Sequence, residues 1–147
     1  MLRRVVLTRD PVEAALAALD PTWATDPPSP SGDLPPGHPL HGATGAWLEF
    51  YGVVRASEDD HQIVALDYEA HPEMAQHQLE QLLSRLETRY PLLAVLVVHR
   101  LGVVPVGTAS LLVRILSAHR KEALEACATL IDELKTWVPI WKHPVRG

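Results

Sequence analysis

Cationic side chains gather at both ends of one amphipathic segment near the C-terminus, residues 117–143. His119 and Arg120 stand at its start, Lys135 lies in its last helical turn, and Lys142 follows a proline. Positive side chains have the wrong sign for the start of a helix. Together with the free backbone N–H groups of a first turn, however, they suit an external anion such as a phosphate. The pattern therefore indicates anion binding, with lysine available for acid/base or electrostatic work.

The spacing of these cations limits how they can act together. His119 and Lys135 are 16 residues apart, which is about 24 Å along one helix. They cannot hold one small ligand within a single chain. Either one site joins two subunits, or one of the clusters serves another purpose. A plainer alternative is that the lysines only complement the helix C-terminus and that the His-Arg pair is solvated.

Three further ionisable residues are expected at strand ends, namely Arg55, His99 and Arg100. Sites are often assembled where elements end beside a sheet. The set is mostly cationic and includes no serine or cysteine nucleophile in a recognisable setting and no metal-ligand cluster, so it indicates an anion pocket. The alternatives are a surface ion pair of Arg55 with Glu58 or Asp59, and edge-strand charges at His99 and Arg100 that discourage aggregation.

Composition narrows the class of protein. The chain has 147 residues, 47% of them hydrophobic and 21% charged, which fits one globular domain over residues 1–147. The net charge of −5 disfavours an extended nucleic-acid footprint. A single cysteine, Cys127, excludes an internal disulfide and fits the cytoplasm, and it falls on an apolar helix face as a core thiol. No apolar run is long enough to span a membrane, and residues 1–20 are interpreted as a strand and a helix, not a signal peptide.

The hydrophobic pattern predicts an α+β fold with a largely antiparallel sheet and a long C-terminal helix. Strands are expected over residues 2–8, 43–54, 62–70, 92–101 and 110–117, and helices over residues 11–19, 72–90 and 117–138. The strand at 62–70 is expected to pair with that at 43–54, and residues 102–107 to form a turn. Residues 21–42 are rich in proline and predict a mobile surface loop. A metal site at His38 and His41 within it is not favoured over a solvated loop.

Local signals predict the helix ends and the inward side chains. Asp10 is the expected N-cap of the first helix, with Pro11 at its first position, and Ser117 that of the last. Pro139 has no N–H and must end that helix, so the chain can fold back and bring Lys142 toward Lys135. The side chains expected to face the core are Met74, Leu79, Leu82, Leu83 and Leu86 in the second helix and Ala123, Leu124, Cys127, Leu130, Ile131, Leu134 and Val138 in the last.

Five sequence blocks carry a resemblance to a known family. They are GAWLEFYGVVR (45–55), LDYEAHPEMA (66–75), HRLGVVPVG (99–107), SAHRKEALEAC (117–127) and DELKTWVPIWK (132–142). In this order and spacing the chain resembles the large, catalytic subunit of molybdopterin synthase. The phrase VPIWK after a DELK helix is the most specific of these signals.

The resemblance implies a fold, an activity and a set of partners. It implies an α/β hammerhead-type fold and a homodimer in which each subunit binds a small ubiquitin-like sulfur carrier, giving a heterotetramer. The carrier's C-terminal Gly-Gly thiocarboxylate would donate sulfur to cyclic pyranopterin monophosphate, building the dithiolene of molybdopterin without a further cofactor or a metal. The family's catalytic lysines correspond to Lys135 and Lys142, and its substrate-binding residues to Arg55, His119 and Arg120.

The implied activity agrees with the charge pattern. An anionic phosphate suits a cationic pocket, and sulfur that arrives on a carrier requires no catalytic cysteine. Because the two clusters are separated by the length of the helix, we expect a site in which His119 and Arg120 of one subunit meet Lys135 and Lys142 of the other. Family members commonly continue beyond the last block with a tail, for which Arg146 could substitute, and the proline-rich loop is longer than usual. The alternative function is a non-catalytic dimeric module with the same fold and an anion pocket.

Overall fold

The structure is a computed structural model that describes residues 1–27, 34 and 37–147. Its elements are β1 (Leu2–Thr8), α1 (Val12–Ala17), α2 (Pro21–Ala24), β2 (Ala46–Val53), β3 (Ser57–Glu58), β4 (His61–Gln62), β5 (Ala65–Ala70), α3 (Pro72–Arg89), β6 (Leu92–Arg100), β7 (Gly102–Pro105), β8 (Ala109–Ser117), α4 (Arg120–Trp137) and β9 (Ile140–Val145). Most of the predicted strands and helices lie within one or two residues of these bounds, and the α+β class is confirmed.

A four-stranded sheet in the order β1-β6-β8-β2 forms the centre of the molecule. β1 runs parallel to β6, whereas β6, β8 and β2 pair antiparallel. The predicted pairing of β2 with the strand expected over residues 62–70 was wrong, because β2 pairs with β8, and that strand, β5, pairs with β7 and β9. β6 and β8 are buried on both faces, so their sequences are nearly continuous apolar runs.

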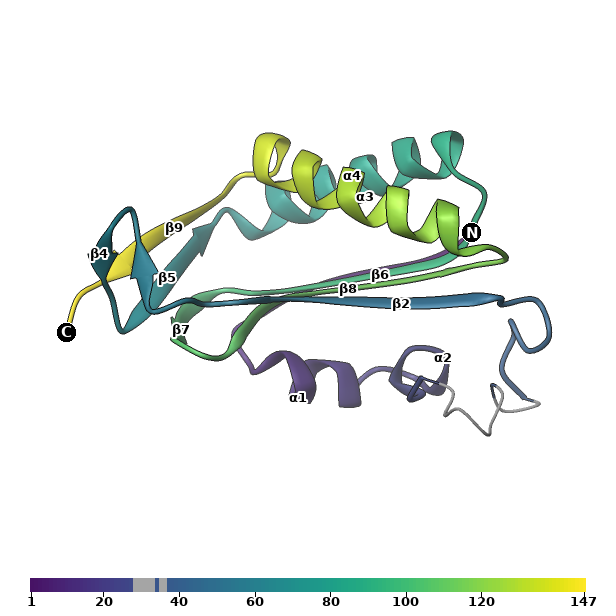
Figure 1. Cartoon of the computed structure of the whole chain (residues 1–147), viewed down its shortest axis with the longest axis horizontal. Coiled ribbons are helices and arrows are strands. Elements are labelled where there is room, and N and C mark those ends of the chain that lie inside the picture. Colours follow the sequence, from purple (N-terminus) through teal and green to yellow (C-terminus); the bar gives the residue numbers. More distant parts are fainter. Residues whose placement is uncertain (28–33, 35–36) are drawn as a thin grey trace.

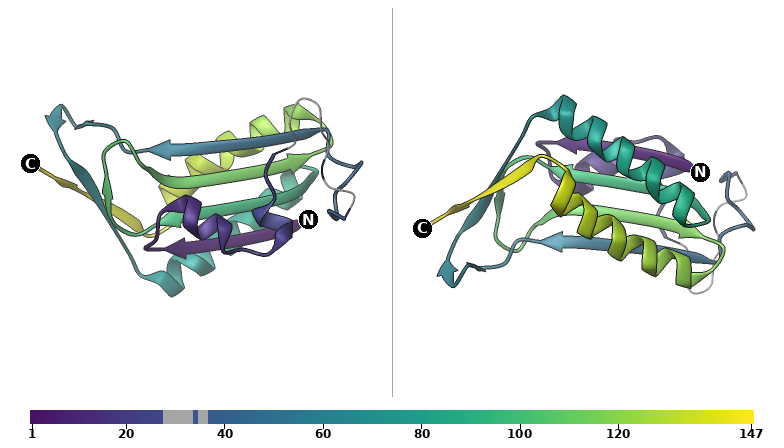
Figure 2. Two further views of the ribbon diagram at one scale, coloured as in Figure 1. Left: turned by 90° about the horizontal axis from the view of Figure 1, so that it is seen from below. Right: turned by 90° about the horizontal axis from the view of Figure 1, so that it is seen from above.

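Helices cover both faces of this sheet (Figures 1 and 2). The long helices α3 and α4 lie side by side on one face, and the short helices α1 and α2 lie on the other. Two apolar clusters result, one under each helix layer. The leucines predicted to face inward on α3 and the Cys127 thiol on α4 are buried as expected, whereas Met74 and Leu124 are exposed. Leu124 lies about 100° around the helix from the buried Ala123 and so misses the apolar stripe.

A second sheet in the order β7-β5-β9 extends from one end of the first. β5, at the centre of this sheet, pairs antiparallel with both neighbours. The prediction of a simple turn over residues 102–107 was therefore wrong in part, because the first four of these residues form β7 before the turn begins. The segment after α4, expected only to fold back, adds β9 to this sheet. It is this sheet that carries Lys142 toward the end of α4.

The predicted C-terminal end of α4 was right, whereas the predicted N-caps of α1 and α4 were wrong. Val138 is extended ahead of Pro139, so α4 ends as predicted. The N-cap of α4 is His119, since the buried Ser117 still belongs to β8 and its hydroxyl donates to the His119 carbonyl. The N-cap of α1 is Pro11, and the amide of Asp10 donates to the Thr8 hydroxyl instead.

The proline-rich segment is not simply a surface loop. Asp20 caps the short helix α2, and Trp23 within it is buried against the sheet. His38 is also buried: its Nε2 lies 3.2 Å from the Thr22 carbonyl oxygen, and its Nδ1 accepts from the Leu40 amide. Both ring nitrogens of His38 are thus used within the chain. The expectation of a loop over residues 28–33 and 35–36 lies outside the described residues.

Candidate active site

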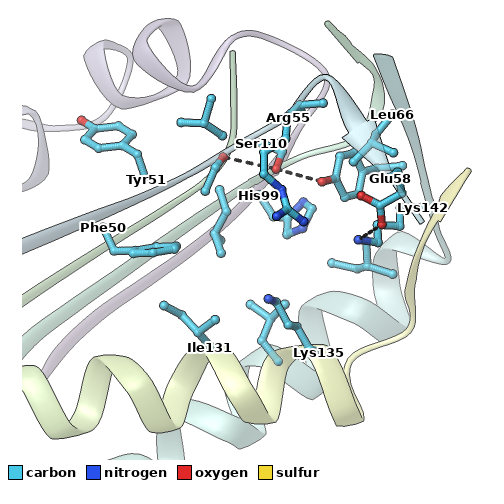
Figure 3. A pocket seen from close by; sticks show the side chains of 17 residues that line it. Phe50, Tyr51, Arg55, Glu58, Leu66, His99, Ser110, Ile131, Lys135 and Lys142 are labelled. Atoms are coloured by element: carbon cyan, nitrogen blue, oxygen red, sulfur yellow. Dashed lines mark hydrogen bonds and ion pairs between the residues drawn. The ribbon is translucent and has the colours of Figure 1, made fainter. Parts of the chain in front are cut away.

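A cavity of about 630 Å³ opens where the end of α4 faces the two sheets. Figure 3 shows its side chains converging from α4 on one side and from the strands on the other. Its lining is a mixture of apolar and ionisable residues: Phe50, Tyr51, Gly52, Val53, Val54, Arg55, Glu58, Leu66, Tyr68, His99, Ser110, Leu111, Ile131, Leu134, Lys135, Ile140 and Lys142.

Three of the predicted site residues line this cavity, namely Arg55, Lys135 and Lys142. Arg55 follows the end of β2, where the amide of the buried Val54 donates to the Thr108 carbonyl at 3.0 Å. Lys135 lies in the last turn of α4, and Lys142 stands opposite Tyr68 in the pairing of β9 with β5. The expectation that the chain after Pro139 brings Lys142 toward Lys135 is thus confirmed by their shared cavity.

His119 and Arg120 do not line this cavity. They occupy the N-cap and first residue of α4, whereas Lys135 lies in its last turn, so the length of the helix separates the two clusters (Figure 1). Both are exposed to solvent. Within this chain the structure therefore brings three of the five predicted site residues together and leaves the His-Arg pair at the opposite end of α4.

The cavity also contains an acid whose contact sequence reasoning had not assigned. Glu58 Oε1 lies 2.5 Å from Lys142 Nζ. The alternative in which Arg55 pairs with Glu58 was wrong, because among the described residues Arg55 forms no ion pair and Glu58 binds Lys142. The sequence placed Glu58 three residues after Arg55, which gave no indication of a contact with Lys142. Only the folded structure brings Lys142 beside Glu58.

His99 forms part of the cavity wall on the internal strand β6. His99 is only 4% exposed and β6 is not an edge strand, so the alternative of an edge-strand charge at this residue was wrong. Burial lowers the pKa of His99 below its ordinary value of 6.5. Its Nδ1 lies 2.8 Å from the Arg100 carbonyl oxygen, which can only accept, so Nδ1 carries the proton and Nε2 of the neutral ring is an acceptor. The ring packs edge-on against Tyr68, with centroids 5.1 Å apart.

The hydroxyl of Ser110 is committed to its neighbours. Its Oγ lies 3.0 Å from the Tyr68 hydroxyl and 3.4 Å from the Gly52 carbonyl oxygen. Cys127 belongs to the core under α4, and burial raises the pKa of its thiol, which disfavours the reactive thiolate. Neither residue is set up as a nucleophile. The cavity instead offers cations and hydrogen-bonding groups on a partly apolar floor, which suits a planar or extended ligand that carries negative charge.

The described part of the chain lacks the features of two other classes of site. No group of three or more His, Cys, Asp or Glu side chains is placed to hold a metal ion there. None of the helices in these residues is both long and apolar enough to cross a membrane.

Known proteins resemble this chain in both sequence and structure. The sequence model of the family described as MoaE protein matches residues 37–137. The molybdopterin synthase catalytic subunit of Thermoplasma volcanium is 41% identical over 101 residues, which are 69% of this chain and 74% of that protein. The catalytic subunit from Oryza sativa subsp. indica is 43% identical over 103 residues, 70% of this chain but only 53% of that protein. The chain thus spans about half the length of the rice relative.

Solved structures share the fold. Molybdopterin synthase from Staphylococcus aureus matches with a TM-score of 0.68 and 31% identity, over 72% of this chain and 77% of that one. A complex of subunits 1 and 2 of molybdopterin-converting factor from Helicobacter pylori matches with a TM-score of 0.64 over 98% of this chain and 84% of that one. At 22% identity the latter supports the fold alone. The fold class expected from the resemblance, including its hammerhead-type arrangement, is confirmed by these structures.

The family model covers more than half of the chain, and the relatives match more than two thirds of it. The match includes Arg55, His119, Arg120 and Lys135 but ends before Lys142. The chain therefore belongs to the MoaE protein family, to which its molybdopterin synthase catalytic subunit relatives point.

Proposed function

We propose that this protein is a molybdopterin synthase catalytic subunit, a sulfurtransferase of molybdenum cofactor biosynthesis. In this reaction a carrier protein's thiocarboxylate donates sulfur to cyclic pyranopterin monophosphate, and two transfers build the dithiolene. The observation that carries the proposal is the cavity in which Arg55, Lys135 and Lys142 meet, in a chain of this family. Its cations match an anionic substrate.

Each cation has a distinct proposed role. Lys135 is the main catalytic residue, acting as acid/base or as a transient partner of the carrier's terminal carbonyl. Lys142 orients the substrate and stabilises developing negative charge. Arg55 binds the phosphate or the pterin. Sulfur arrives on the carrier, so the reaction needs no thiol from this chain, in keeping with the burial of Cys127.

The proposed partners are a small ubiquitin-like carrier subunit and a second copy of this chain. The carrier's C-terminal Gly-Gly tail would enter the cavity, and two carriers on a homodimer would give a heterotetramer in the cytoplasm. Subunits 1 and 2 of molybdopterin-converting factor from Helicobacter pylori form a complex, and we propose a pairing of the same kind for this chain. We also propose that residues 1–147 form a single domain and that the protein binds neither nucleic acid nor a membrane.

The position of His119 and Arg120 favours a site shared between subunits. Within one chain they are separated from Lys135 by the length of α4, yet they complete the set of cations that the family resemblance implies. In the homodimer, His119 and Arg120 of one subunit would contribute to the cavity of the other. Mixed dimers that carry Arg120→Ala in one subunit and Lys135→Ala in the other test this arrangement. Recovery of activity above both homodimeric variants supports a shared site, and the absence of recovery contradicts it.

The central experiment is a sulfur-transfer assay read by mass spectrometry. Purified protein is mixed with a thiocarboxylated carrier and cyclic pyranopterin monophosphate, with Lys135→Ala alongside and the exposed Arg85→Ala on α3 as a charge-matched control. We expect dithiolene product from the wild type and the control and none from Lys135→Ala. Binding of the carrier without product from the wild type would favour the non-catalytic module. Two observations argue against that alternative. The chain is similar to proteins named molybdopterin synthase catalytic subunit, and it has both Lys135 and Lys142.

A further inference from the structure

The ion pair between Glu58 and Lys142 is unequal in its exposure. The Glu58 side chain is 14% exposed, whereas that of Lys142 is 52% exposed, and their charged atoms lie 2.5 Å apart. Both residues line the cavity (Figure 3). The carboxylate is therefore the sheltered and fixed member of the pair, and the lysine is the member that reaches solvent and any ligand.

Backbone hydrogen bonds and packing hold Glu58 in place. It belongs to the β3–β4 hairpin, where Glu58 pairs with His61 and the amide of Ile63 donates to the Ala56 carbonyl at 2.9 Å. The two turn residues, Asp59 and Asp60, have φ values of 49° and 62°, as a tight hairpin turn of the I′ type requires. Ile63 anchors the hairpin in a small apolar cluster with Val54, Leu66 and Val104. The carboxylate is thus presented from a fixed support.

The lysine, in contrast, needs an external contact to fix its head group. Lys142 has a flexible four-carbon stem, and its ammonium has three donors, of which the contact with Glu58 Oε1 uses one. A second donor stays available for a ligand oxygen while the ion pair persists. The same carboxylate places a negative charge in a cavity whose other ionisable residues include Arg55 and Lys135, and this charge opposes the binding of an anion.

We propose that Glu58 is a positioning residue for Lys142, which it holds at the cavity wall at the cost of some affinity for anionic ligands. The inference rests on the proposed function, because it assigns Lys142 to the reacting site. It has an unusual consequence: removing the charge of Glu58 weakens catalysis and strengthens anion binding at the same time. A residue with a purely structural role would not move these two quantities in opposite directions.

The decisive variant is Glu58→Gln, which keeps the shape of the side chain and removes its charge. We expect kcat for sulfur transfer to fall at least about tenfold, within the ~100-fold range that a small misplacement can cost. We expect the Kd for inorganic pyrophosphate, measured by calorimetry, to fall roughly threefold to tenfold because a repulsive charge is gone. Glu58→Asp, which keeps the charge on a shorter stem, should retain the weaker pyrophosphate binding of the wild type and recover part of kcat.

The neighbouring acid supplies the matched control. Asp59→Asn removes the same charge one residue away, and asparagine tolerates the positive φ at that position. It should leave kcat and pyrophosphate affinity unchanged. If Asp59→Asn and Glu58→Gln behave alike, the effect is one of overall charge and the positioning role is refuted.

A spectroscopic measurement separates this inference from the proposed function. The chain has three lysines, so ¹⁵N-lysine labelling gives few ammonium signals, and Lys142→Arg identifies the one that belongs to Lys142. The Lys142 signal should show slow proton exchange in the wild type and in Asp59→Asn, and fast exchange in Glu58→Gln. An unchanged signal in Glu58→Gln would overturn the inference. If the wild type transfers no sulfur, the proposed function fails, whereas the lysine signal and pyrophosphate binding still decide the role of Glu58.

Discussion

Two carboxylate–cation pairs lie on the segment that runs from β2 into the β3–β4 hairpin, and they differ in the exposure and the contacts of their cations. Glu49 on β2 pairs with Arg114 on the neighbouring strand β8, and the arginine side chain is only 2% exposed. Glu58 pairs with the half-exposed Lys142 in the wall of the cavity. We call the first the enclosed pair because its cation is enclosed by the protein. The cation of the second pair faces the space in which a ligand would bind.

Each guanidinium nitrogen of the arginine in the enclosed pair has an acceptor. Arg114 Nε and Nη2 lie 2.8 and 2.7 Å from Glu49 Oε1, and Nη1 donates to the Trp23 carbonyl in α2. The guanidinium also stacks on the Trp47 ring at 4.7 Å. Lys142, by comparison, has one protein partner and spare donors. The comparison indicates that a saturated cation fixes the fold, whereas a cation with one sheltered partner remains able to bind a ligand.

The largest change in the free energy of unfolding is expected when the ion pair between Glu49 and Arg114 is broken. Arg114→Met should lower the free energy of unfolding by about 3–5 kcal/mol, because it leaves the Glu49 carboxylate without a cation, with only the hydrogen bonds from Trp47 and Tyr51, and releases α2 from the sheet. Urea denaturation of the wild type and the variant measures this difference. The exposed Arg85→Met on α3 is the control and should stay within about 0.5 kcal/mol of the wild type.

A double substitution tests whether the stranded carboxylate causes that loss. Adding Glu49→Leu to Arg114→Met removes the unpaired charge and should restore a large part of the stability. If Arg114→Met alone costs less than about 1 kcal/mol, the pair behaves like a surface ion pair and the contrast with Lys142 disappears.

A smaller effect is expected at His99, which is buried without a counter-ion. Burial lowers its pKa in the folded state below 6.5, so between the folded and unfolded pKa values the unfolded chain binds more protons. Stability should therefore fall as pH drops below about 6.5, by up to ~1.4 kcal/mol per pH unit, and level off below the folded pKa. His99→Gln should show a shallower loss. Parallel urea titrations between pH 7 and pH 5 measure the difference, and identical slopes for both proteins would contradict a buried neutral imidazole.

These residues also show which features the sequence can predict. Local periodicity was sufficient for β1, α3 and α4, because side-chain period and proline positions act within a few residues. The predicted partner of β5 was wrong, because the alternating pattern of Ala65–Ala70 is compatible with several partner strands. Arg114 interrupts an apolar strand, which marks it as paired, but Glu49 lies 65 residues away in the chain. Only the three-dimensional fold connects them.

The sequence could predict individual residues of the candidate site but not the contacts between them. Arg55, Lys135 and Lys142 were identified by type, position and resemblance, and the fold brings them together. Glu58 was missed as a partner of Lys142 because their contact depends on a hairpin meeting β9 across 84 residues of sequence. For His119 and Arg120, the helix length that excludes them from the cavity of their own chain was also calculable from the sequence.

The smallest change in stability is expected where the effect on activity is large. Lys142→Met should alter the free energy of unfolding by about 1 kcal/mol or less, because its partner faces an open cavity and water can replace the ammonium at Glu58. Under the proposed function the same substitution should abolish most of the sulfur transfer. Urea denaturation and the dithiolene assay on one preparation measure both quantities. A loss of several kcal/mol would mean that Lys142 is as structural as Arg114, and its place in the reaction would then need a direct test by Lys142→Arg, which keeps the charge and the ion pair.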